Sequence, residues 1–237
     1  MGLVLAGVRV QLIEQTGFGV RSATLTFARP GSAVRFTLFP MLHLGSPAFY
    51  REVRRRLGEC DVVVVEGVGG KTTSLITLAY RLGGRVRRGG LVDQGRGLDL
   101  AGLKGRIVRP DLTAAQFARG WRKVSRKLRW LLLAAGPVFG LWLVIVGPRR
   151  ALGRNLALDD LPSREEEELS DAWPGFDEAM LDARDQALCQ ELERLAAGAD
   201  PVTVGVCWGA GHMRAVIALL HMRLGYRIVS ANWMTVF

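Results

Sequence analysis

The residues of this sequence best suited to chemistry are two histidines and one glutamate. His43 and Glu66 each follow an apolar run near the start of the chain, and His212 follows a glycine-rich turn near its end. Because ligands bind at the carboxyl ends of strands in open α/β sheets, these three side chains are expected to meet at one sheet edge. Two imidazoles and a carboxylate suit a divalent metal such as Zn, Mn, Co or Fe. We therefore predict a metal site of His43, Glu66 and His212, the alternative being ordinary polar residues in loops.

Arg184 is a fourth candidate, because it falls on the inner face of a predicted helix. At 100° per residue, Arg184 lies in the middle of the apolar face of the helix expected over 176–197. A guanidinium in that position needs a partner or a ligand. Glu191, one heptad later on the same face, offers a structural ion pair as the alternative to a functional role. Asp185 lies at the edge of the face and is the weaker candidate.

The elements that must position these residues have the patterns of an α/β fold. Four consecutive valines at 62–65 are typical of a strand that is buried on both faces. Ser46 and Pro47 predict the start of a helix that continues to residue 58. Gly225 is expected to end the helix that follows His212. Further strands are expected at 22–27, 33–39, 201–208, 226–229 and 233–236, and a further helix at 111–127. Together these segments predict an α/β fold with a central mixed β-sheet flanked by helices.

Length and composition favour one domain in a reducing compartment. The 237 residues, 49% of them hydrophobic, can form one core, so we expect a single domain over 1–237 with a helical insertion at 112–175. The three cysteines contain no CxxC pair, which argues against a disulfide framework and a cysteine zinc site. The first residues resemble no secretory signal. These features predict a cytoplasmic protein.

The insertion combines a basic helix end with an apolar, hairpin-like segment. The net charge of +10 favours an anionic partner, unless arginine-rich usage is merely a habit of the genome. Nucleic acid is not the expected partner, because no zinc-finger, RNA-binding or helix-turn-helix signature is present. The uncharged run 130–148 approaches the length of a membrane span, but one crossing would separate His43 and Glu66 from His212. We therefore expect 119–154 to contact an anionic membrane surface peripherally, at the inner face, or to form a homodimer contact.

Several blocks of the chain resemble a known family. The block FTLFPMLHLGSPAFYREVRRRLGECDVVVVEGV is similar to the opening block of the TraB/GumN-like family, and VGVCWGAGHMRAVIALLHMRLGYRIVSANWMTVF is similar to its closing block. LVDQGRGLDL and RPDLTAAQFARGW resemble the middle of that family, and DARDQALCQEL resembles the helix that carries an Arg-Asp pair. The resemblance runs over most of 39–237. The family is grouped with Tiki-type, ChaN-like and erythromycin-esterase-like proteins, which share two GxxH motifs and a glutamate.

The resemblance implies a metal-dependent hydrolase, in particular a peptidase. It matches His43 and His212 to the two motif histidines and Glu66 to the glutamate. We hypothesise that the histidines hold a metal ion that acidifies bound water, and that Glu66 completes the metal shell or acts as general base. Arg184 would stabilise the developing oxyanion of a peptide or small-molecule substrate. Pro40 stands where the first motif has glycine, which favours the alternative of a non-catalytic relative that sequesters a peptide or another ligand.

The segment VVVVEGVGGKTT resembles part of a phosphate-binding P-loop. A P-loop at Gly70-Lys71-Thr72 would need its first glycine at position 65, and Val65 stands there. The phosphate cradle would therefore lack a residue that its backbone geometry needs, and nucleotide binding is the least favoured alternative.

Overall fold

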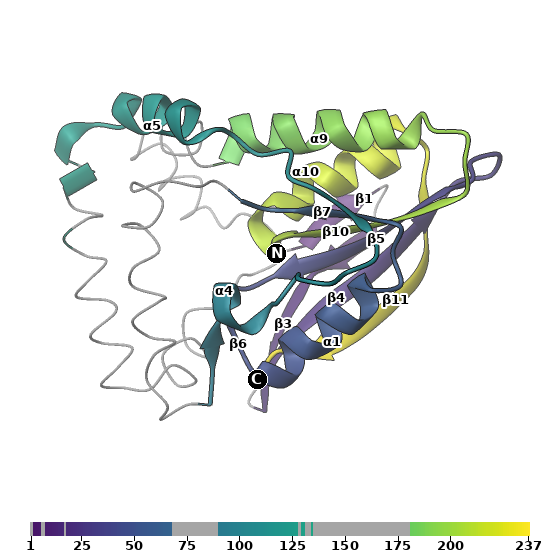
Figure 1. Cartoon of the computed structure of the whole chain (residues 1–237), viewed down its shortest axis with the longest axis horizontal. Helices are drawn as coiled ribbons and strands as arrows, with labels where there is room; N and C mark the ends of the chain where they lie inside the picture. The colour runs from purple at the N-terminus through teal and green to yellow at the C-terminus, as the bar shows by residue number, and fades with distance from the viewer. Residues whose placement is uncertain are drawn as a thin grey trace.

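The computed structural model describes residues 2–5, 8–16, 18–67, 90–127, 129, 130, 134 and 181–237. The predicted α/β class is confirmed: a seven-stranded mixed sheet carries α9 and α10 on one face and α1 on the other (Figure 1). Most of the expected insertion at 112–175, including the apolar run after Trp130 and the P-loop candidate at 70–72, lies outside the described residues. Among the residues that are described, no helix is both long and apolar enough to cross a membrane.

The sheet has a parallel centre and an antiparallel flank, in the order β11-β4-β5-β10-β7-β9, with β3 paired to β4. Its strands are β3 (Ile13–Thr16), β4 (Gly19–Ala28), β5 (Val34–Met41), β7 (Val62–Val65), β9 (Arg106–Val108), β10 (Val202–Gly209) and β11 (Arg227–Thr235). Strand β10 runs parallel to both β5 and β7, and β7 runs parallel to β9. Two short antiparallel ladders lie apart from it: β1 (Gly2–Leu5) with β2 (Val8–Gln11), and β6 (Leu44–Gly45) with β8 (Val92–Asp93).

The helices that are described are α1 (Pro47–Leu57), α4 (Gln94–Gly97), α5 (Ala114–Lys123), α9 (Ala183–Ala196) and α10 (Met213–Ala218). A 3₁₀ turn (Ala210–His212) precedes α10 and a π-helical turn (Leu219–Arg223) follows it. Gly225 has the positive φ of +75° expected where a helix ends.

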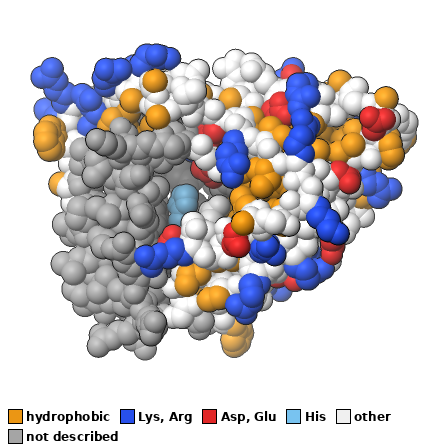
Figure 2. Space-filling model, in the orientation of Figure 1, with side chains coloured by type: hydrophobic (Ala, Val, Ile, Leu, Met, Phe, Trp, Pro, Cys, Tyr) orange, Lys and Arg blue, Asp and Glu red, His pale blue; other side chains and the backbone are white. Residues whose placement is uncertain are grey.

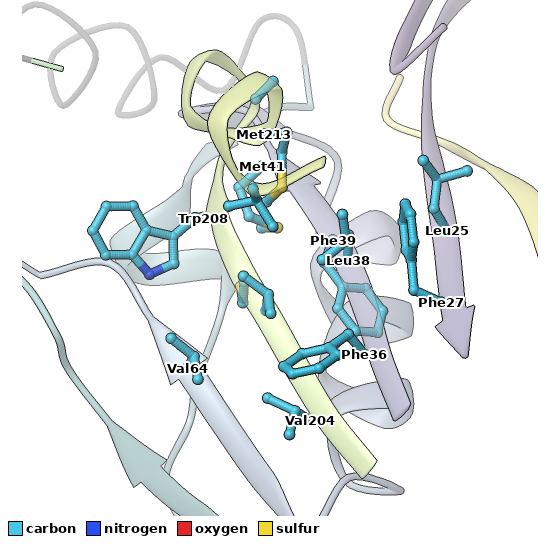
Figure 3. Packing of buried hydrophobic residues seen from close by; sticks show 14 of the residues in the cluster. Leu25, Phe27, Phe36, Leu38, Phe39, Met41, Val64, Val204, Trp208 and Met213 are labelled. Carbon is cyan, nitrogen blue, oxygen red and sulfur yellow. The ribbon is translucent and has the colours of Figure 1, made fainter. Parts of the chain in front are cut away.

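Parallel strands and helices enclose one apolar core. All four valines of β7 are buried, as the run predicted. Phe36 of β5 lies beside Val204 of β10, with which it is level in the ladder, and Met213 of α10 belongs to the same cluster near Met41, at the other end of β5 (Figure 3). Burial of each such large side chain contributes about 1.5–3 kcal/mol. The core therefore holds the strand ends in fixed positions, together with the residues that follow each strand.

Helix α1 packs against the face of the sheet that is turned away from α9 and α10, and its end lies close to β10 (Figure 1). Its start is as predicted: the Ser46 hydroxyl accepts a hydrogen bond of 3.2 Å from the Phe49 N–H, and Pro47 is the first helical residue. A Cβ at Gly205 would lie 2.9 Å from Cys60 Sγ and from Leu57 Cδ2. Glycine at that position therefore lets the helix end and the central strand approach each other.

Several predicted boundaries differ from the observed ones, and the pairing and capping of the chain explain two of the differences. The strands expected at 226–229 and 233–236 form one strand, β11, because β4 pairs with it along its length, apart from a bulge between Ile228 and Ser230. The helix expected from 111 starts at Ala114, because Thr113 and Gln116 form a capping box. Residues 176–180 of the helix expected over 176–197 lie outside the described residues, and α9 covers 183–196.

Candidate functional site

The four parallel strands end side by side at one edge of the sheet. In the ladders Met41 of β5 is level with Gly209 of β10, and Val64 of β7 is level with both Val206 of β10 and Val108 of β9. The residues that follow these ends are therefore brought together. His43 follows β5, Glu66 follows β7, Asp111 follows β9 and His212 follows β10.

Arg184, the second residue of α9, joins three of these strand ends. Its Nε and Nη2 donate hydrogen bonds of 2.9 and 2.7 Å to the two carboxylate oxygens of Asp111, in a bidentate arrangement. The same Nη2 donates to Glu66 Oε1 at 2.7 Å, and Nη1 lies 3.3 Å from His212 Nε2. Arg184 is 7% exposed. Burial would lower the pKa of the guanidinium, but Asp111 and Glu66 outweigh it and raise the pKa above its ordinary value, so Arg184 stays charged.

Glu66 connects β7 to the turn after β10. Its Oε2 accepts a hydrogen bond of 2.9 Å from the Gly209 N–H, while Oε1 faces Arg184. Burial alone would raise the pKa of this carboxyl group, but the charge and hydrogen bond of Arg184, with His212 and the Gly209 N–H, hold the pKa below its ordinary value. Glu66 is therefore a carboxylate at neutral pH.

Asp111 is the functional candidate that the sequence reasoning missed. Its side chain is 1% exposed and accepts hydrogen bonds from the Gly67 and Leu112 N–H groups as well as from Arg184. These partners outweigh burial and lower the pKa of its carboxyl group. The signal in the sequence was weak, because Asp111 stands three residues after the short strand β9, whereas Glu66 directly follows β7.

His212 has a partner at each ring nitrogen. Its Nδ1 lies 2.6 Å from Asp185 Oδ1, and its Nε2 faces Arg184. A guanidinium only donates hydrogen bonds, so Nε2 must be the accepting nitrogen in this arrangement and Nδ1 carries the proton that Asp185 accepts. Asp185, the weaker candidate from the helical pattern, therefore orients a predicted site residue.

Trp208 forms the floor under this network. The guanidinium of Arg184 lies 5.2 Å from the centre of the indole, and the imidazole of His212 meets it edge-on at 5.1 Å. The indole Nε1 is buried and has no hydrogen-bond partner among the described residues. An aromatic floor of this kind lowers the local dielectric and so strengthens the ion pairs above it.

His43 lies at the exposed side of the same group. Its backbone carbonyl accepts a hydrogen bond of 2.9 Å from the Gln94 N–H, which fixes the chain at that point. The pKa of its imidazole is lowered, chiefly because surrounding protein atoms desolvate the cation; Glu66 opposes this shift, and Arg184 and His212 add to it. His43 is nevertheless exposed at its surface. The face drawn in Figure 2 is hollowed near its middle, and histidine surface is visible in that hollow.

The structural alternative considered for Arg184 is not the one observed. Glu191 pairs with Arg194 on its own helix, at 2.5 Å, rather than with Arg184. The partners of Arg184 come instead from the ends of β7, β9 and β10. The position of Arg184 on the inner face of α9 was predicted. The side chains of the sheet that it contacts were not predicted as its partners.

Two of the predicted metal ligands, His212 and Glu66, make hydrogen bonds to other residues in this arrangement. Both nitrogens of His212 and both oxygens of Glu66 already face hydrogen-bonding partners. A cation between these two residues would have to displace the guanidinium of Arg184. Within the described part of the chain, no group of three or more His, Cys, Asp or Glu side chains is arranged to hold a metal ion. The metal site of His43, Glu66 and His212 thus stays a prediction.

The buried carboxylates predict that the fold is sensitive to acid. Because the pKa values of Glu66 and Asp111 are lowered in the folded state, their contribution is present above the unfolded values of about 4 and is lost as the pH falls through the folded ones. We expect the free energy of unfolding in urea to be steady between pH 7 and about 5 and to fall steeply below about 4. An Asp111→Asn variant should be less stable at pH 7 and lose less on acidification; equal pH dependence in both proteins would contradict this.

Taken together, the strand ends offer a desolvated imidazole beside a fixed cation. Arg184 has five N–H groups, and four of them face Asp111, Glu66 and His212, which leaves one at Nη1 that faces none of these residues and can serve a ligand. A base, a cation and an oriented second imidazole are the parts that acyl-transfer and hydrolytic sites use. Comparison of the chain with models of protein families, with curated proteins and with solved structures gives no match.

Proposed function

We propose that this protein is a hydrolase whose site is formed by His43, Glu66, Arg184 and His212, and that its substrate is a peptide or another small molecule with an acyl group. The observation that carries the proposal is the position of Arg184: a buried guanidinium, held by two carboxylates, lies against His212 and close enough to His43 to shift its pKa. A purely structural arginine would have no reason to contact one histidine and act on the pKa of a second at the carboxyl edge of a parallel sheet.

The residues have distinct roles in this proposal. His43 is neutral at pH 7 because its pKa is lowered, so it can accept a proton from a water molecule that attacks the substrate carbonyl carbon. The remaining N–H of Arg184 donates to the oxygen that becomes negative. The proton on His43 then passes to the leaving group as the carbon–heteroatom bond breaks. Glu66 and Asp111 hold Arg184 in place, and Asp185 orients His212.

The resemblance to the TraB/GumN-like family supports the same class of reaction. We propose membership in that family, and with it the metal dependence that the resemblance implies, through Zn, Mn, Co or Fe. A resident metal would supply a more acidic water and a Lewis acid. The hydrogen-bonded arrangement described above supports the hydrolytic site without one, so the metal requirement is a separate question for experiment.

A non-catalytic protein that sequesters a peptide or another ligand is the second candidate. Pro40, which stands where the family motif has glycine, favours it. In the structure Pro40 lies level with Trp208, and its carbonyl accepts a hydrogen bond of 2.7 Å from the Ser22 hydroxyl. The proline thus fixes the strand just before His43, which suits a rigid binding surface.

A test of the proposed function uses the purified full chain with activated esters and internally quenched peptides. The protein is assayed after removal of metal by a chelator and again after addition of Mn, Co or Zn. We expect turnover in at least one of these conditions. Turnover only with added metal would support the metal site, and turnover in the chelated protein would support the arginine-centred site. Ligand binding without turnover in every condition would contradict a hydrolase and support the second candidate.

The compartment is a separate proposal. All three cysteines are free, and burial raises the pKa of the Cys60 thiol to about 11. Such unreactive thiols are compatible with the reducing cytoplasm that the cysteine pattern predicted. We propose that the protein works there in peripheral contact with the inner face of a membrane. A homodimer contact is the alternative to this membrane contact.

A further inference from the structure

Helix α5 has one buried face and one basic face. Phe117 and Trp121, four residues apart, are buried, and the Thr113 capping box fixes the start of the helix. At 100° per residue, Arg119, Arg122 and Lys123 lie on the opposite side of the helix. All three are exposed, and so are Arg126 and Lys127 just after the helix. We call these five residues the α5 basic face.

The sequence of this region carries only basic charges. No aspartate or glutamate occurs between Thr113 and Trp130, whereas the basic residues of that stretch are the α5 basic face and Arg129. Lysine and arginine side chains gather over α5 at the upper left of the molecule (Figure 2). Elsewhere on the surface Arg55 and Arg56 of α1 pair with Glu52, and Arg194 of α9 pairs with Glu191. The α5 basic face thus has the composition of a surface that meets an anionic partner.

An exposed tryptophan and a hollow adjoin the basic face. Trp130 is 73% exposed, which is unusual for the largest apolar side chain in a protein. Beside it lies a hollow of about 390 Å³, whose described lining is Trp121, Arg126, Arg129 and Trp130. The Nε of Arg129 is buried there and has no hydrogen-bond partner among the described residues. A phosphate oxygen is a natural acceptor for such a group.

We infer that this surface docks onto the anionic leaflet of a lipid membrane. The α5 basic face lies against the headgroup phosphates, and Trp130 enters the interfacial layer, where tryptophan side chains are favoured. A nucleic acid would also attract the cations, but an exposed tryptophan followed in the sequence by an uncharged apolar run suits a lipid interface better. The inference uses no residue of the proposed hydrolytic site, so the two can fail independently.

Co-sedimentation of the full chain with lipid vesicles tests the inference. We expect binding to phosphatidylcholine vesicles that contain phosphatidylserine, weak binding to pure phosphatidylcholine, and weakening by salt. Each cation near such a surface is worth about fivefold in affinity, so Arg119→Gln, Arg122→Gln and Lys123→Gln together should weaken binding about 100-fold. The matched control replaces three exposed cations elsewhere, Arg35→Gln, Arg51→Gln and Lys104→Gln, and should lose far less affinity.

A second variant and a second ligand complete the test. Trp130→Ala should weaken vesicle binding several-fold at unchanged charge, and circular dichroism should show that each variant is folded. Equal losses in the two triple variants would mean that net charge alone drives binding, and would overturn the docking surface. Equal binding to the two kinds of vesicle, or tighter binding to a short DNA or RNA duplex than to anionic vesicles at the same salt concentration, would also overturn it.

Discussion

Replacing Arg184 with methionine should lower the free energy of unfolding by about 3–5 kcal/mol. The substitution keeps much of the volume and removes the charge, so Glu66 and Asp111 are left buried without their cation. Asp111, whose side chain is 1% exposed, cannot recover that loss from solvent. Urea unfolding followed by circular dichroism measures the effect, and hydrolytic activity should be lost in the same protein.

Arg194→Met is the matched control for this prediction. Arg194 lies on the same helix and also forms a bidentate pair, with Glu191, but it is exposed. Loss of an exposed pair should change the free energy of unfolding far less, because solvent already screens the two charges. Arg184→Lys is the conservative variant: it keeps the charge but loses the bidentate contact with Asp111, and should be intermediate in stability. Similar losses for Arg184→Met and Arg194→Met would contradict the description of Arg184 as the centre of a buried network.

Replacing His43 with alanine should separate activity from stability. If His43 is the general base, kcat/KM should fall by about 10²–10⁴, because proton transfer by a positioned side chain contributes that much. The free energy of unfolding should change far less than for Arg184→Met, because the backbone contact of His43 with Gln94 is retained and no buried charge is left without its partner.

His221→Ala provides the comparison for the His43 variant. His221 is the third histidine of the chain and faces the Tyr226 carbonyl and Arg227, away from the site. It should keep the activity of the parent protein. A His43→Ala protein as active as His221→Ala would remove His43 from the mechanism, whatever the outcome for Arg184.

Much of the site could be located from the sequence because its residues stand at the carboxyl ends of parallel strands. Glu66 follows a run of valines and His212 follows two glycines, and both features predict the end of a strand in a parallel sheet. The carboxyl ends of such strands meet at one edge whatever the residues between them, so proximity follows from strand direction. The structure brings Glu66 and His212 to the same guanidinium.

Asp111 is the site residue that could not be located in this way. Strand β9 has only three residues, too few for a clear pattern, and Asp111 was assigned to the start of a helix. The helical pattern placed Arg184 on an inner face but could not say what lies opposite, because that depends on strand order. The choice of Glu191 as its alternative partner failed for this reason. Similarly, the polar residues Ser230 and Asn232 hid the continuity of β11, because an edge strand needs little hydrophobic patterning.

The central claim is that Arg184 joins segments far apart in the sequence into one site. A double-mutant cycle with Arg184→Met and Glu66→Gln, measured as the free energy of unfolding in urea at pH 7, tests it most directly. The hydrogen bond of 2.7 Å between the buried guanidinium and the half-buried carboxylate of Glu66 predicts a coupling energy of about 1.5–3 kcal/mol. Additive effects, within about 0.5 kcal/mol, would contradict the claim.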